Sequence, residues 1–227
     1  MNELFAATVL FVGAHFVLSS APVRAPAVAR LGERRFQAVF SVVMLVAFLW
    51  MLLAYARAPI IQLWPAVAGL AWIPVLVMPV ALFLAVCGFS TPGPTTTGDG
   101  EPAPSGSPAT GIFRVTRHPF LWGAALWALS HLPSNGDAAN FILMTGILVL
   151  SLGGMWHIDR KNEVRLGSDW GPIVLTTSAV PFAALLSRRT RMDWAGIGWW
   201  RPVVTAALYV AILLLHEPLL GASAFPA

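Results

Sequence analysis

The sequence predicts an all-α fold, a polytopic membrane helical bundle of about six transmembrane helices plus one interfacial or re-entrant helix. Apolar residues make up 57% of the 227-residue chain and charged residues only 11%, and the mean hydropathy is +0.74. The apolar residues come in blocks of roughly 17–25, the length that crosses a hydrocarbon core about 30 Å thick as a helix. Backbone groups in lipid must be satisfied internally and no block alternates like a barrel strand, so helices are expected.

Six blocks are predicted to cross the membrane and to form one integral membrane domain over residues 1–227. Their limits are 3–21, 36–56, 66–89, 118–133, 138–157 and 200–220. The fourth is short. The first has neither a basic start nor a clear cleavage site, so we expect a retained helix and not a signal peptide.

Two further segments are not expected to cross. The apolar stretch 172–186 is interrupted by Pro172 and Pro181, which favours an interfacial or re-entrant helix. The segment 91–111 is rich in Pro, Gly, Ser and Thr, a composition typical of a flexible loop, and is predicted to be cytoplasmic.

The basic residues support this number of crossings. Of the 14 Lys and Arg residues, all but Arg57 then lie on one side, which is predicted to be cytoplasmic, with both termini on the other side. The expected location is a membrane, with these basic residues at its cytoplasmic face. Because these residues lie in short loops between apolar blocks, the pI near 10.2 does not indicate nucleic-acid binding. The expected partners are the lipid bilayer and an apolar small-molecule substrate.

Two histidines lie within predicted membrane segments, where ionisable residues are costly and often functional. Helix geometry places His15 roughly 10 Å and His131 roughly 18–20 Å from the cytoplasmic face. Neutral imidazole is a common axial ligand of haem, and such sites form between facing helices of a bundle. Gly123 and Trp127 share the face of His131 through their i, i+4, i+8 spacing. Alternatively, each imidazole only donates a hydrogen bond to a neighbouring carbonyl.

His118 belongs to a different part of the same segment. It precedes His131 by 13 residues, which on a helix is about 20 Å and a large rotation, so the two cannot easily share a compact site. Arg117 and His118 are expected at the cytoplasmic end, with Pro119 in the first helical turn.

The remaining polar positions have simpler expected roles. His157 is predicted to mark the cytoplasmic interface, and His216 either caps the end of the last segment with Glu217 or contacts a ligand. Asp137 is expected to cap the segment that comes after it. The single cysteine, Cys87, excludes an intrachain disulfide and a Cys-x-x-Cys-His haem attachment.

At these residues the chain resembles the NnrU family of bacterial membrane proteins. The likeness rests on FRVTRHPFLWGAALWALSHLPSNGD together with GAHFVLSS, LGERRF and LLLHEPLLG. The family is similar to plant carotenoid isomerases that contain b-type haem, and its bacterial members are named for an association with denitrification genes. The resemblance implies a haem b cofactor, an isomerase-like or redox activity, or a role beside denitrification enzymes.

The resemblance also implies a set of site residues. His15 and His131 match the two haem-ligand histidines, whereas His118 matches a motif position that is not a ligand. Ala128 stands where the plant enzyme has a cysteine proposed as an alternative ligand, so the likeness does not extend to a His/Cys ligand exchange. The predicted metal ligands are His15 and His131, and the predicted cofactor-binding residues are these two with Gly123, Trp127, Arg117 and His118.

A second resemblance provides the alternative function. The Arg-His-Pro motif and the later stretch NEVRLGSDWG look like those of the isoprenylcysteine methyltransferases, which hold S-adenosylmethionine at the cytoplasmic face. The candidate residues would be Arg117, His118, Glu163 and Trp170. The paired glutamates of that pattern are reduced here to Glu163 alone.

Overall fold

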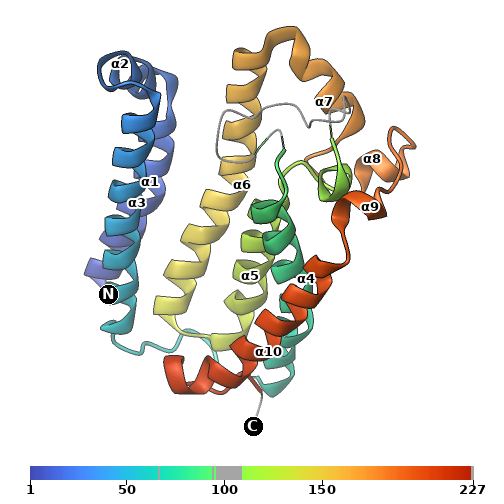
Figure 1. Ribbon diagram of the computed structural model, residues 1–227. Coiled ribbons are helices and arrows are strands. Elements are labelled where there is room, and N and C mark those ends of the chain that lie inside the picture. Colours follow the sequence, from blue (N-terminus) through green and yellow to red (C-terminus); the bar gives the residue numbers. More distant parts are fainter. Residues whose placement is uncertain (66, 94, 96–108, 226–227) are drawn as a thin grey trace.

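The computed structural model describes residues 1–65, 67–93, 95 and 109–225, and these residues form helices joined by turns (Figure 1). The predicted all-α fold class is confirmed. Most of the predicted 91–111 loop lies outside the described residues. The longer helices are α1 (Asn2–Ser19), α3 (Glu33–Ala56), α4 (Ala68–Ser90), α5 (Pro119–Asn135), α6 (Ala138–Leu166) and α10 (Trp200–Leu220). The shorter elements are α2 (Ala21–Leu31), η1 (Gly111–Arg114), η2 (Gly167–Asp169), α7 (Trp170–Thr176), α8 (Ala183–Leu186) and α9 (Trp194–Ile197).

Within the described part of the chain, five helices are long and apolar enough to cross a membrane: α1, α3, α4, α6 and α10. The sixth predicted crossing, 118–133, corresponds to α5, which has 17 residues. Contacts place the helices in the order α3, α1, α6, α5, α4, α10. Figure 1 shows α1 and α3 on one side of α6 and the pair α4 and α10 on the other. The middle of this order, α6 and α5, forms the wall that both outer pairs pack against.

A tight turn between α5 and α6 makes these two helices antiparallel. Gly136 has φ of +67°, a conformation that glycine adopts without strain. A Cβ at this position would also lie 2.5 Å from the carbonyl oxygen of Trp64. The Asp137 side chain accepts from the backbone N–H of Asn140 at 2.8 Å, which confirms the predicted cap. The Asn-Gly-Asp sequence therefore sets the direction of α5 relative to α6.

Glycines on α6 bring α1 close and fix the direction in which it runs. Gly146 lies against the Thr8 methyl group, and a Cβ at Gly153 would lie 2.8 Å from the Phe16 ring. Position numbers thus rise together on the two helices, so α1 runs parallel to α6. Since α5 is antiparallel to α6, α1 and α5 are also antiparallel.

Two predicted boundaries need correction. The segment after the first crossing was expected to be a loop, but residues 21–31 form α2, which has Pro22 in its first turn, a position that proline tolerates. Gly32, with φ of +79°, ends it. The fifth crossing was predicted to end at 157, yet α6 continues to Leu166. Hydropathy detects only the apolar part of a helix, and the last turns of α6 are charged.

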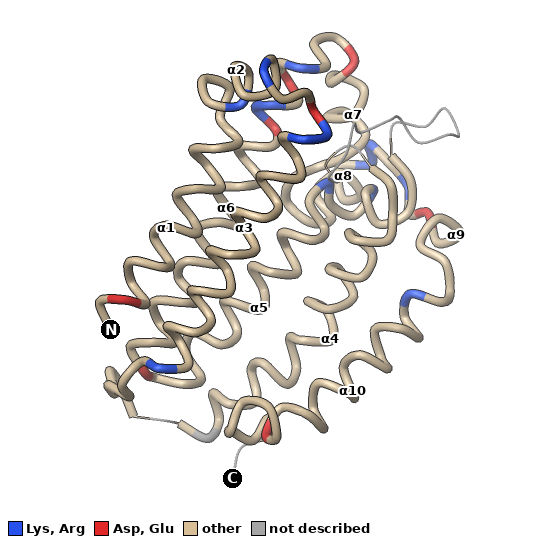
Figure 2. Tube along the Cα trace, turned by 60° about the vertical axis from the view of Figure 1, so that its left-hand side comes forward, with Lys and Arg blue, Asp and Glu red and all other residues tan. Residues whose placement is uncertain are grey.

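The short helices and most of the basic residues lie at one end of the bundle (Figure 2). Arg57 caps the C-terminal end of α3, and this end of α3 lies at the other end of the bundle (Figure 1). The 172–186 stretch forms the end of α7, a turn and the four-residue α8. Seven helical residues extend only about 10 Å, so this stretch does not cross.

Arg201 and Tyr209 attach α10 to its neighbours. The Arg201 side chain is buried and donates to the Ser90 hydroxyl at 2.8 Å and to the Ser90 carbonyl at 3.0 Å. Its other guanidinium nitrogen donates to the carbonyls of Gly196 and Ile197. Further along, the Tyr209 hydroxyl donates to the Val75 carbonyl at 2.7 Å. Polar bonds at the first turns of α10 therefore orient the rest of the helix along α4.

Asp193 joins α9 to η1 through both of its carboxylate oxygens. One accepts from the Gly196 N–H at 2.9 Å and the other from the Gly111 N–H at 2.8 Å. These two bonds hold the pKa of Asp193 below its usual value, because they favour the charged form. A depressed folded-state pKa stabilises the fold fully above the unfolded value of about 3.9, and this contribution is lost as pH falls through the folded-state pKa.

Replacing Asp193 in two steps should give graded losses of stability. Asp193→Asn keeps one acceptor oxygen and should cost about 1 kcal/mol, and Asp193→Ala loses both bonds and should cost about 2 kcal/mol. Unfolding of the detergent-solubilised protein between pH 7 and pH 3 measures both effects. The stability difference between wild type and Asp193→Ala should shrink toward the acid end. Equal losses for the two variants at pH 7 would show that only one of the bonds contributes.

Candidate functional site

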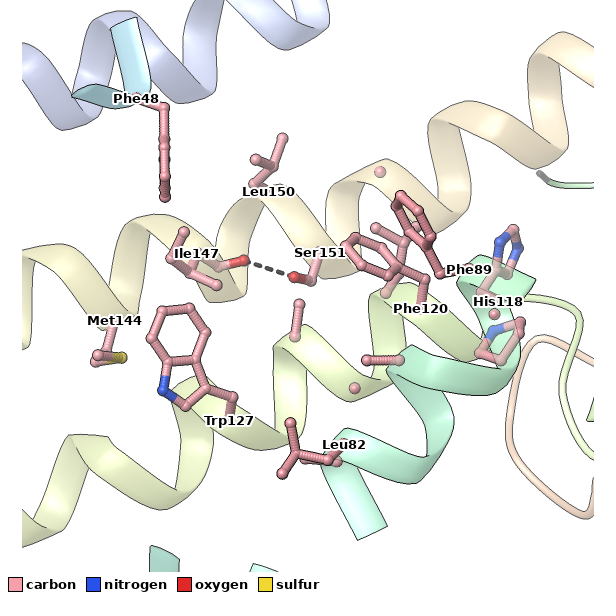
Figure 3. Close-up of a pocket in the computed structure, with 18 of the residues that line it drawn as sticks. Phe48, Leu82, Phe89, His118, Phe120, Trp127, Met144, Ile147, Leu150 and Ser151 are labelled. Carbon is pink, nitrogen blue, oxygen red and sulfur yellow. Dashed lines mark hydrogen bonds between the residues drawn. The ribbon is translucent and has the colours of Figure 1, made fainter. Parts of the chain in front are cut away.

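One large cavity of about 1620 Å³ lies among the long helices, with lining residues from α1, α3, α4, α5, α6 and α10. Its walls are mainly apolar. Figure 3 shows Phe48, Leu82, Trp127 and Ile147 around it. The volume exceeds the roughly 300–1,000 Å³ of ordinary small-molecule pockets. It is therefore large enough for a bulky, mostly apolar ligand.

His15 and His131 both line this cavity. His15 Nδ1 donates to the carbonyl of Phe11 at 2.9 Å, and His131 Nδ1 donates to the carbonyl of Trp127 at 2.9 Å. In both, the acceptor lies four residues earlier on the same helix. Both imidazoles thus donate to a neighbouring backbone carbonyl, as expected if they are not haem ligands. However, neither Nε2 atom has a hydrogen-bond partner among the described residues.

The helix directions make these two side chains lean toward each other. The Phe16 contact at Gly153 and the bond from Asn140 to the His131 carbonyl place the two histidines about 12 residues apart along α6, roughly 18 Å in helical rise. Side chains on a helix tilt toward its N-terminus. Because α1 and α5 are antiparallel, His15 and His131 tilt toward the level between them. Both imidazoles therefore point toward the part of the cavity that lies between their two levels.

The surroundings of the two imidazoles favour a ligand with its own metal donors. Among the described residues, no group of three or more His, Cys, Asp or Glu side chains is placed to hold a metal ion. Two imidazoles alone would leave most coordination positions of a bare ion unfilled. A haem supplies four ring nitrogens and needs only axial ligands from the protein. The residues present fit a haem better than a bare ion.

Gly123 and Trp127 have different roles at this site. A Cβ on Gly123 would lie 2.6 Å from the Ala81 carbonyl oxygen and 3.0 Å from the Ala85 nitrogen, so this glycine permits close packing of α5 on α4. The Trp127 ring lies 6.2 Å from the His131 ring at an angle of 71°, and the Trp127 carbonyl accepts the His131 bond. Both residues line the cavity.

Arg117 and His118 form a separate polar cluster at the start of α5. The guanidinium of Arg117 binds both carboxylate oxygens of Asp159, with its shortest distance 2.7 Å. His118 Nε2 lies 2.9 Å from the same carboxylate. Trp170 lies beneath the guanidinium, 5.9 Å from it. His118 thus belongs to a polar cluster of its own, as predicted: Asp159 on α6 binds His118 and not His131.

His118 borders the far end of the cavity (Figure 3), whereas Arg117 is not among the described lining residues. The His118 side chain is fully buried, and its Nδ1 has no hydrogen-bond partner in the described part of the chain. The start of α5 is further held by the Trp122 indole and the Thr116 hydroxyl, which both donate to the Ala179 carbonyl at 2.8 Å. The Arg-His-Pro motif therefore joins α5 to α6 and to the turn before α8.

The four residues of the methyltransferase alternative are only partly brought together. Arg117 and His118 bind Asp159, and Trp170 packs against the Arg117 guanidinium. Glu163 instead forms an exposed ion pair with Arg160 at 2.7 Å. Both side chains of the motif are bound by a carboxylate of the protein itself.

Asp159 was not identified from the sequence. It lies in HIDRKNEVR, where an acidic residue among basic ones is ordinary for a membrane boundary. Only packing of α5 on α6 reveals that it binds two residues more than 40 positions earlier. His157, predicted as a boundary residue, lies 3.0 Å from the Ser19 hydroxyl through Nε2 and so connects α6 with α1.

The helices and the cavity together define a polytopic helical membrane protein with a large, mainly apolar cavity whose lining includes histidines. The chain belongs to the NnrU family: the family model described as NnrU protein matches residues 3–224. No solved structure matches the chain.

The chain is also similar to two plant enzymes. It is 38% identical to the chloroplastic 15-cis-zeta-carotene isomerase of Arabidopsis thaliana over 80 residues, which are 35% of this chain and 22% of that protein. It is 30% identical to the corresponding protein of Zea mays over 118 residues, which are 51% of this chain and 32% of that protein. The matches thus span between about a fifth and a third of the length of these curated relatives.

Removing the Asp159 carboxylate should weaken the fold without involving the two membrane histidines. Asp159→Ala leaves Arg117 and His118 without their acceptor, and we expect a loss of about 2–3 kcal/mol, since bonds to charged groups contribute this much. Thermal unfolding in detergent measures the effect. Glu163→Ala is the matched control, an exposed acid one turn further on α6, and should change stability by less than about 0.5 kcal/mol. Equal losses for both would mean that the cluster contributes little.

Proposed function

We propose that this protein binds haem b between His15 and His131 and acts on an elongated apolar molecule in the rest of the cavity, as an isomerase-like membrane enzyme. The observation that carries the proposal is that the ring nitrogens of the two imidazoles have the same hydrogen bonding. Each donates from Nδ1 to a backbone carbonyl, and each lines the cavity with its Nε2 unbonded among the described residues. The similarity to 15-cis-zeta-carotene isomerase supports the apolar substrate class.

The carbonyl bonds prepare both imidazoles for coordination. A donor bond at Nδ1 fixes the tautomer in which Nε2 carries the lone pair, and it fixes the orientation of the ring. The Phe40 ring, 5.7 Å from the His15 ring at 89°, further restricts rotation of His15. His131 is restricted in the same way by Trp127. In the neutral form of each ring, Nε2 is then the nitrogen available to bind iron.

The remaining walls suit a hydrocarbon. Phe48 from α3, Leu82 from α4 and Ile147 from α6 face the cavity (Figure 3), and these side chains offer no hydrogen bonds. Such a lining excludes water from a bound polyene and holds it by dispersion and burial of apolar surface. When bound, haem would supply an iron centre able to transfer an electron or act as a Lewis acid.

A non-enzymatic role uses the same site. A haem sensor, or a factor that assists denitrification enzymes, would bind haem through the same two histidines without converting an apolar substrate. The two roles share haem binding and differ only in whether a substrate is converted, so an activity measurement on the loaded protein separates them.

Haem binding is tested by the optical spectrum of the protein purified from cells with ample haem supply. Wild type should show a Soret band, His15→Ala should remove it or shift it with loss of bound haem, and His131→Ala should shift it. His157→Ala is the matched control, because this histidine also lines the cavity but its Nε2 contacts Ser19; its spectrum should match wild type. A colourless wild-type protein would reject the proposal.

The substrate class is tested by incubating the haem-loaded protein, oxidised and reduced, with a cis-polyene and separating the isomers by chromatography. We expect conversion to the trans isomer. Leu82→Trp, which enlarges a side chain on the α4 wall of the cavity, should lower the rate by at least about tenfold through misplacement of the substrate, while the Soret band is kept. Haem binding with no conversion of any polyene would favour the sensor or accessory role.

A further inference from the structure

The five histidines of the chain fall into two groups by the state of Nε2. In His118 and His157 the Nε2 atom contacts another side chain, Asp159 and Ser19 respectively. In His15, His131 and His216 the Nδ1 atom bonds a backbone carbonyl, and Nε2 has no hydrogen-bond partner among the described residues. All three of the latter line the cavity. His216 thus shares each feature that makes the other two candidate ligands.

His216 lies at the same end of the cavity as His131. Its helix, α10, ends beside the end of α5 in the lower part of the bundle (Figure 1). Ser134 and Asn135 at the end of α5 and the segment 222–224 after α10 line this end together. A ligand bound by His131 would therefore lie near His216.

The orientation of His216 is maintained by the turn that ends α10. His216 Nδ1 donates to the Ala222 carbonyl at 2.7 Å. That carbonyl is turned back toward the helix because Gly221 adopts φ of +70° and donates to the Glu217 carbonyl at 2.8 Å. A cap of this kind needs no histidine, since the glycine already ends the helix. The imidazole instead has a fixed tautomer whose Nε2 carries the lone pair.

We propose that His216 is a second ligand donor on the His131 side, so that the cavity offers three imidazoles whose Nε2 has no hydrogen-bond partner among the described residues. The inference rests on the proposed haem site and adds to it a residue from α10. Its basis is the matched donor state of the three rings and the shared location of His131 and His216.

The test compares full-length His131→Ala with the double variant His131→Ala/His216→Ala, purified with haem supplied. The single variant should keep bound haem with a low-spin, six-coordinate spectrum, because His216 replaces the lost imidazole. The double variant should turn five-coordinate and release haem to apomyoglobin at least about tenfold faster, the lower end of what a lost supporting group costs a metal site. Added imidazole should restore the low-spin spectrum of the double variant and leave the single variant unchanged.

Glu217→Gln in the His131→Ala background is the matched control, an exposed neighbour that is not among the described lining residues. It should behave like His131→Ala alone. Identical spectra and haem release for His131→Ala and the double variant would overturn the inference and leave His216 as a helix cap. A wild-type protein without a Soret band would instead reject the haem site itself, so the two failures are distinguishable.

Discussion

The antiparallel turn between α5 and α6 determines how the histidines of the cavity are arranged. Gly136 and Asp137 reverse the chain within two residues, and the turn is bonded to the segment before α4 through the Leu63 and Trp64 N–H groups. This turn makes α5 antiparallel to α1, so the side chains of His15 and His131 tilt toward a common level. A parallel α5 would tilt both rings the same way. The possible ligand set of the cavity therefore depends on the conformation of one short turn.

Much of this fold is predictable from the sequence because a membrane makes apolar length decisive. The crossings, the non-crossing 172–186 stretch and the Asp137 cap each depend on local composition, which is readable without tertiary structure. The α2 helix is not predicted, since arginines and prolines after a crossing look like a loop. The charged extension of α6 is missed because hydropathy carries no information beyond the bilayer. Helix propensity and packing, not hydropathy, decide both.

The candidate site is predictable only in part, for a similar reason. A lone membrane histidine such as His15 is conspicuous in an apolar segment, and helix geometry already separates His118 from His131. Asp159, by contrast, is one acid in a charged stretch, and its role exists only through packing of α6 on α5. The likeness of His216 to His15 and His131 depends on which ring nitrogen is bonded, a property that no sequence spacing expresses. Side-chain bonding states are the part that the structure adds.

The glycines of α6 have a consequence for the dimensions of the cavity. Gly146 and Gly153 lie on either side of the level of His15. Because they have no Cβ, the side chains of α1 pack directly against the backbone of α6 at these two positions. The distance between α1 and α6 is thus set where two side chains are missing, together with the Ser19–His157 contact near the end of α1. A methyl group at either position would have to displace a side chain of α1 or push the helix outward. The two glycines therefore set how closely α1 packs on α6, and with it the width of the cavity beside His15.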